Sequence, residues 1–405
     1  MKGYTIAIGV VLAGITLLLI ASGNRWSVSK FAPFQNGCLQ YSVVQRKGYC
    51  SWRFMDYQPS AWEQDWMTNL EDRKMKVCEL IYKGDNLKNS IAWVSRNIEL
   101  MSNNVGAEFE YQSKSDDLYS RMIYEFSCSD QADEESLKMN GAKMEMMIEP
   151  LVGNTRDPFT ICPSMPSEVP DAVGNRQGWD SVQSKRHLLM GPYSPIRFQR
   201  PSDSTWTSWT LDRAAVLPDT ATLPVLQGRR IILFDLGAAL YGSWLQGALD
   251  AASTKFFVDN FQMRRGINFT HIYAFEYTVN KPSDVWGQVP KEIVPYYHYI
   301  NVGVESKIDG HYNPFTILQQ IATPQDFVVI KLDIDSPHIE NPLVEQLVNT
   351  PSLLELVDEM TYEHHVHTPE MLRYWGNLPI DLTLTQTYSY FTRLRKAGVR
   401  MHSWP

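Results

Sequence analysis

The sequence predicts an α/β fold in which a doubly wound, mostly parallel sheet forms the C-terminal domain. Short apolar runs that suit buried parallel strands alternate with stretches of helical periodicity from residue 229 onward. The clearest of these runs are RRIILFD at 229–235, HIYAFE at 271–276 and DFVVIKLDI at 326–334. Because parallel strands need helical crossovers, the alternation indicates a Rossmann-like sheet, with ligands at the carboxyl ends of its strands.

Weaker signals fill the rest of this domain, residues 229–405. Helical periodicity occupies the stretches between strands, and further short strands are expected toward the C-terminus. The expected helices cover 243–265, 338–349 and 381–396, and the further strands cover 299–304, 354–362 and 399–404.

Composition indicates a folded, acidic protein of at least two domains. The chain has 405 residues, of which 44% are hydrophobic and 20% charged, which excludes general disorder. The net charge is −8. Nucleic acid is therefore not an expected partner, because its phosphates need a basic face.

The N-terminus predicts a membrane segment. Tyr4–Gly23 is an uncharged run of 20 residues, which as a helix matches the apolar core of a bilayer. A cleaved signal peptide is the alternative, because Ala21 and Gly23 are small residues at a cleavage position. The apolar run is longer than a signal-peptide core, which favours a signal anchor over 1–23. We therefore expect a single-pass membrane protein with the remainder on the lumenal side of the Golgi or endoplasmic reticulum.

Residues 24–165 form the expected second domain, of α+β type, and a segment rich in proline and glycine connects it to the C-terminal domain over 166–228. In an oxidising lumen, one or two disulfides are expected in this domain, with one thiol left over. The alternative is a set of unpaired, buried thiols in a reducing compartment. The five cysteines are Cys38, Cys50, Cys78, Cys128 and Cys162.

The ends of the first two strands suggest a cofactor site. The first strand ends in Asp235-Leu236-Gly237, where a glycine allows backbone to approach a ligand closely. The second strand ends at Glu276, whose carboxylate could accept hydrogen bonds from both hydroxyls of a ribose. The alternative for Glu276 is a solvated carboxylate at a strand end.

The strand at 326–334 carries two acids near its end. Asp333 and Asp335 are two residues apart, so in an extended chain they face the same side and can converge. Such a pair could bind a divalent metal ion, or one carboxylate could act as a base. Alternatively, one acid caps the helix that starts near Pro337 and the other pairs with Lys331.

Three histidines follow the next strand, beside two glutamates. His364, His365 and His367 could take part in a metal site, or they could form a polar strand end with one catalytic base. In an extended chain His364 and His365 point to opposite faces, so a single site needs a turn between them.

Four segments resemble FkbM-type methyltransferases in their order and spacing. They are FDLGAALYGSW, HIYAFE, VVIKLDIDSPHIE and LVDEMTYEHHV. The resemblance covers Arg229 to the C-terminus, and Lys331, Asp333, Asp335 and Glu340 match the lysine, acidic pair and trailing acid of that family. The segments GVRMHSWP and IEPLVGNTRDPFTIC further resemble a membrane-anchored branch of algae and plants.

This resemblance implies the class I fold and S-adenosylmethionine as cofactor. It implies that Asp235, Gly237 and Ala238 lie in the cofactor loop and that Glu276 binds the ribose. Asp333 would then lie near the methyl acceptor, and we take Asp333, Asp335 and His364 as the candidate catalytic residues.

The expected function is O-methylation of a hydroxyl on a glycan, sugar or lipid-linked acceptor in the secretory pathway. No residue is assigned as a metal ligand for this reaction. One alternative is a Golgi-type glycosyltransferase in which Asp333 and Asp335 hold a divalent metal ion against a nucleotide sugar. Another is a methyltransferase-like binding protein without activity.

Overall fold

The computed structural model describes residues 50–69, 120–148, 196–199, 201–202, 207–209, 230–242, 253–265, 268–366 and 381–403. All of them belong to one compact unit of the chain, Val43–Pro405. The expected membrane segment lies outside the described residues. Within the described ranges, no helix is both long and apolar enough to span a membrane.

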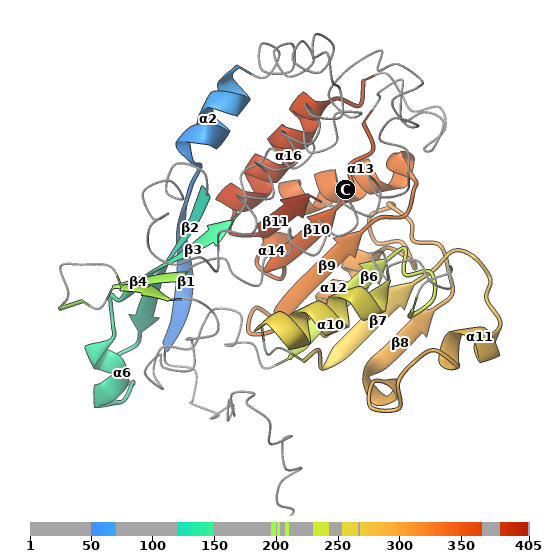
Figure 1. Ribbon diagram of the computed structural model, residues 1–405, viewed down its shortest axis with the longest axis horizontal. Helices are drawn as coiled ribbons and strands as arrows, with labels where there is room; N and C mark the ends of the chain where they lie inside the picture. The colour runs from blue at the N-terminus through green and yellow to red at the C-terminus, as the bar shows by residue number, and fades with distance from the viewer. Residues whose placement is uncertain are drawn as a thin grey trace, which may run out of the picture. The chain divides into compact units, whose positions relative to one another are not determined.

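The C-terminal part contains a six-stranded sheet in which every pair of neighbours is parallel, as the apolar runs predict (Figure 1). Its order is β11-β10-β9-β6-β7-β8. From β6 the chain builds outward to β8, and then it crosses back and builds from β9 to β11. The strands are β6 (Ile231–Leu236), β7 (His271–Phe275), β8 (Tyr297–Ile300), β9 (Phe327–Leu332), β10 (Glu359–Tyr362) and β11 (Arg400–Ser403).

Helices follow most of these strands. The helix that follows β9 begins at Pro337, one residue before its predicted start, and proline suits that position because the first helical N–H needs no partner. The helical elements are α10 (Thr254–Arg265), α11 (Pro282–Trp286), η5 (Val294–Tyr296), α12 (Pro314–Ile321), α13 (Pro337–Asn349), α14 (Pro351–Leu354) and α16 (Leu384–Lys396).

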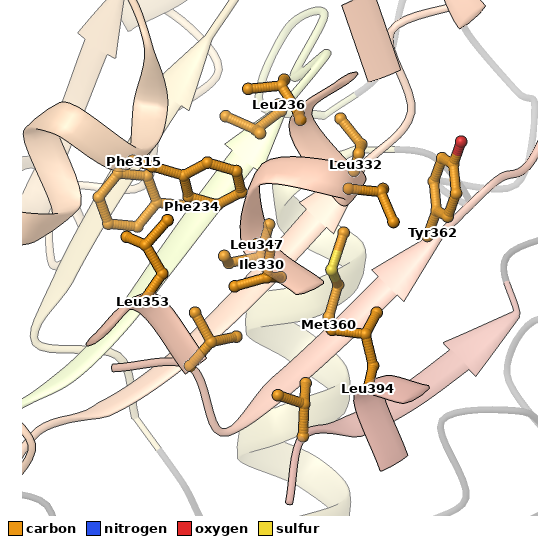
Figure 2. Close-up of a cluster of buried hydrophobic side chains, with 14 of the residues drawn as sticks. Phe234, Leu236, Phe315, Ile330, Leu332, Leu347, Leu353, Met360, Tyr362 and Leu394 are labelled. Atoms are coloured by element: carbon orange, nitrogen blue, oxygen red, sulfur yellow. The ribbon is translucent and has the colours of Figure 1, made fainter. Parts of the chain in front are cut away.

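Helices cover both faces of the parallel sheet, because alternate side chains of each strand point to opposite faces. On one face, Phe234 and Ile330 pack in a cluster with side chains of α12, α13 and α16, such as Phe315, Leu347 and Leu394 (Figure 2). On the other face, residues of β6, β7 and β9 pack in a second cluster that contains the phenylalanines of α10.

A second sheet, of five antiparallel strands in the order β1-β2-β3-β4-β5, is formed by earlier residues. Two helices, α2 (Ala61–Thr68) and α6 (Glu134–Lys138), accompany it, which agrees with the expected α+β type. Its last two strands fall within 166–228, the segment predicted as a connection. The strands are β1 (Cys50–Gln58), β2 (Ser120–Cys128), β3 (Lys143–Ile148), β4 (Ile196–Gln199) and β5 (Thr207–Trp209).

A disulfide between Cys50 and Cys128 joins β1 to β2, where the two residues are paired across the strands. It agrees with the prediction of one or two disulfides in this region. Cys38, Cys78 and Cys162 lie outside the described residues.

A buried arginine links α16 to the elements of the antiparallel sheet. Arg395 forms an ion pair with Glu63 of α2, at 3.4 Å, and a hydrogen bond to the hydroxyl of Tyr57 in β1, at 3.1 Å. Its Nε and Nη2 donate to the carbonyl of Met401 in β11. The charge is thus fully paired, as a buried guanidinium requires.

Candidate functional site

The predicted site residues gather where β6, β9 and β10 end, next to the point where the strand order reverses. In parallel α/β sheets this position is where a crevice for ligands forms, because the chain leaves neighbouring strands in opposite directions. Three segments meet there: 237–239 after β6, 333–335 after β9 and 363–365 after β10.

Gly237 brings the segments after β6 and β9 into contact. It has a φ of +87°, and a Cβ at this position would lie 1.8 Å from the carbonyl oxygen of Asp333. Ala239 also has a left-handed backbone, with a φ of +51°. The turn therefore needs glycine both for its conformation and for its close approach to backbone.

A buried lysine holds these two segments together. The Nζ of Lys331 donates to the carbonyl of Gly237 at 2.6 Å and lies 3.4 Å from Asp235 and 3.6 Å from Asp333. Only 1% of the lysine side chain is exposed. Burial alone would lower the pKa of Lys331, but the two carboxylates outweigh it and raise the pKa. The two carboxylates therefore stabilise the charged form of the lysine.

Asp235, predicted in the cofactor loop, is a fully buried residue of β6. Its carboxylate accepts a hydrogen bond from the hydroxyl of Thr254 at 2.7 Å and pairs with Lys331. Ala238, also predicted there, is buried, and its N–H donates to the carbonyl of Phe275. Both residues therefore stabilise the turn through buried contacts.

Glu276 lies directly after β7, beside the glycine turn. One of its carboxylate oxygens accepts the N–H of Ala239 at 2.8 Å, and the other accepts the N–H of Thr278 at 2.6 Å. The structure therefore brings together Gly237 and Glu276, two of the predicted cofactor residues. A carboxylate has about four acceptor positions, so two remain on Glu276 for other donors.

Asp333 and Asp335 have different partners. Asp333 faces Lys331, as the alternative interpretation held, whereas Asp335 lies 3.3 Å from Nε2 of His365. The helix cap is Ser336, and its side chain forms no capping hydrogen bond. The carboxylates of the two acids therefore do not converge on one partner in this structure.

A cluster of Asp335, Glu363 and His365 occupies the ends of β9 and β10. One ligand-type atom from each lies within 4.8 Å of the others. The imidazole of His365 is 1% exposed, and its Nδ1 lies 2.9 Å from a carboxylate oxygen of Glu340 in α13. Burial would lower the pKa of His365, but the hydrogen bonds to Asp335 and Glu340 raise it to about 11.

His364, a predicted catalytic residue, is turned away from this cluster. Its side chain is buried between the rings of Tyr362 and Tyr390, and its Nδ1 lies 2.5 Å from the hydroxyl of Thr387. Burial, assisted by the charge of His365, lowers the pKa of His364 to about 3. The two histidines thus have opposite environments, as their alternation predicts.

The pKa of His364 makes stability depend on pH. In the unfolded chain this histidine takes up a proton near pH 6.5, but in the folded chain only near pH 3, so acidification favours unfolding. We expect wild type to lose about 2 kcal/mol between pH 6.5 and 4.5 relative to His364→Asn. Urea unfolding of both proteins across this range measures the difference, and parallel curves would show that His364 takes up its proton at the same pH in the folded and the unfolded chain.

Two further residues contribute to the site. From the sequence, Glu340 matches only the trailing acid of the resembled family, and neither Glu340 nor Glu363 is predicted to have a role in the site. Glu340 is fully buried, and it accepts the N–H of Ile334 at 2.9 Å as well as holding His365. Glu363 was noted only as a neighbour of the histidines. A signal for Glu340 was present, because an acid in the first turn of a helix after a buried strand lies near the strand end. His367 lies outside the described residues.

The fold and the site define a parallel α/β protein with an acidic, histidine-containing edge. Comparison of the chain with protein-family models, curated proteins and solved structures gives no match. The resemblance to FkbM-type methyltransferases therefore stays a prediction from sequence.

Proposed function

We propose that this protein is an S-adenosylmethionine-dependent O-methyltransferase with a Rossmann-like catalytic domain. The observation that carries the proposal is the contact between the turn at Gly237 and the carboxylate of Glu276. A glycine turn after the first strand and an acid after the second are the two parts that bind an adenosine cofactor in this type of sheet. When the strands are numbered along the chain with β6 as strand 1, their order across the sheet from β8 to β11 is 3-2-1-4-5-6. This is the strand order of sheets that bind adenosine-containing dinucleotides, so it also supports the proposal.

In this proposal the cofactor's ribose hydroxyls donate to the acceptor positions that remain on Glu276. The cofactor would supply the methyl group, and Asp333 and Asp335, which follow β9, would be the acids available to the methyl acceptor. Methyl transfer requires the acceptor oxygen to approach the methyl carbon in line with the bond to sulfur, and positioning supplies much of the acceleration. The oxygen–carbon bond forms as the carbon–sulfur bond breaks, and sulfur takes the bonding electron pair.

The proton of the acceptor hydroxyl needs a base that reaches solvent-accessible space. The side chain of Asp335 is 82% exposed, whereas that of Asp333 is 12% exposed and faces Lys331. His364 is buried and weakly basic. We therefore favour Asp335 as the proton acceptor over the other two candidates. The acceptor remains a glycan, sugar or lipid-linked hydroxyl, as the resemblance implies.

Titration of S-adenosylmethionine into the full-length protein by calorimetry tests the cofactor site. We expect binding in the micromolar range, weakened about tenfold to a hundredfold in Glu276→Gln, because hydrogen bonds to a charged group are lost. Glu355→Gln, which alters an exposed acid at the end of α14, serves as the matched control. Absence of binding to wild type, or equal binding to all three proteins, would contradict the proposed site.

A further inference from the structure

The cluster of Asp335, Glu363 and His365 has the composition of a metal site with open positions. It offers two carboxylate oxygens and one imidazole nitrogen from the segments after β9 and β10. Oxygen and imidazole ligands together suit divalent ions such as Zn²⁺ and Mn²⁺, whereas Mg²⁺ and Ca²⁺ prefer oxygen alone.

The distances within the cluster match those between ligands of one ion. Two ligand atoms that each lie about 2.1 Å from a tetrahedral Zn²⁺ are separated by about 3.4 Å. Nε2 of His365 lies 3.3 Å from Asp335 and 3.7 Å from Glu363. Small side-chain movements therefore suffice to place the three atoms around an ion.

The orientation of His365 is fixed by a residue outside the cluster. Glu340 is fully buried, accepts the N–H of Ile334 with one oxygen and lies 2.9 Å from Nδ1 of His365 with the other. Nδ1 faces this carboxylate, so Nε2 is the nitrogen directed at Asp335 and Glu363, and an ion that binds there takes the place of the proton on Nε2. Histidine ligands of metals are typically held by a carboxylate in this way. This contact distinguishes the site from an acidic surface cluster.

We propose that Asp335, Glu363 and His365 bind one divalent transition-metal ion, with Glu340 orienting the histidine. Three protein ligands leave at least one coordination position for water or a substrate oxygen, as in catalytic sites. The exposure of Asp335 gives that position access from solvent. An acceptor hydroxyl on the ion would lose its proton more easily, and the carboxylate oxygen of Asp335 that is not on the ion would accept it. This use of the ion rests on the proposed function, but binding of the ion does not.

Calorimetry on the full-length protein, first treated with a chelator, tests the site with Zn²⁺ and Mn²⁺ as probes. We expect one ion per chain to bind, and its dissociation constant to rise at least tenfold in Asp335→Asn and in Glu363→Gln. The exposed position of Asp335 ensures that at least this variant folds. Glu340→Gln should weaken binding by a similar factor through the histidine, and Glu355→Gln should leave it unchanged.

Co²⁺ as a second probe reports on the ligands, because its visible absorption depends on the coordination geometry. The spectrum should change in Asp335→Asn and stay the same in Glu355→Gln. Absence of binding, or equal affinity in wild type and the Asp335 and Glu363 variants, would overturn the proposal. Titration of S-adenosylmethionine without metal separates the two proposals: retained cofactor binding with no metal binding overturns the metal site alone.

Discussion

Replacing Gly237 by alanine is expected to lower the free energy of unfolding by about 4 kcal/mol. The alanine would have to adopt a left-handed backbone conformation, and its Cβ would clash with the main chain of a neighbouring segment. At a φ of +87°, the new Cβ would lie 1.8 Å from the carbonyl oxygen of Asp333. That oxygen belongs to the main chain directly after β9 and cannot turn aside as a side chain does. The segments after β6 and β9 would have to separate, and with them the contacts of Lys331.

Gly141→Ala is a matched control for this effect. Gly141 has a φ of +82°, but a Cβ there would have no atom within 4 Å. Its replacement should cost about 1 kcal/mol, from backbone strain alone. The difference between the two variants in urea unfolding measures the close approach at Gly237. Equal losses would show that the two segments do not touch as closely as the structure describes.

The parallel sheet was predictable because its central strands are buried on both faces. Such strands appear in the sequence as continuous apolar runs. The strands β7 and β9 lie within the predicted ranges, and β6 extends one residue beyond its range, to Leu236. Shorter strands were placed less well. The predicted strand at 354–362 begins in α14 and becomes extended only at Glu359, because the first part packs as a helical turn after Pro351.

The antiparallel sheet was only partly predictable. In β1 the exposed and buried residues do not alternate regularly, and the pairing with β2 shifts between Phe54 and Asp56. A strand with such an irregularity lacks the period of two that identifies it in a sequence. The strands β4 and β5 have four and three residues, too few to stand out in a segment rich in proline.

The site residues were predictable by type and place, but their partners were not. The pattern that paired Asp333 with Asp335 assumes an extended chain, yet β9 ends at Leu332 and Asp335 has a φ of +53°. The chain therefore turns between the two acids and directs them to different partners. The partners Lys331 and His365 depend on how β9 lies against β6 and β10, which local sequence does not determine.

Lys331→Met should destabilise the protein by about 3–5 kcal/mol, because it leaves the fully buried carboxylate of Asp235 without its cation. The methionine fills a similar volume, so lost packing contributes little. Thermal and urea unfolding at pH 7 measure the loss. The same variant also removes the hydrogen bond to the carbonyl of Gly237, so a second variant is needed to separate the two effects.

The double variant Asp235→Asn/Lys331→Met removes the unpaired charge while asparagine can still accept the hydroxyl hydrogen bond of Thr254. If the buried charge dominates, the double variant should regain at least half of the stability lost in Lys331→Met, since a neutral amide is far less costly to bury than a carboxylate. If instead the double variant is as unstable as the single one, the lysine stabilises this edge chiefly by fixing the turn at Gly237. In that case both variants should also lose S-adenosylmethionine binding, because the turn would no longer hold its place beside Glu276.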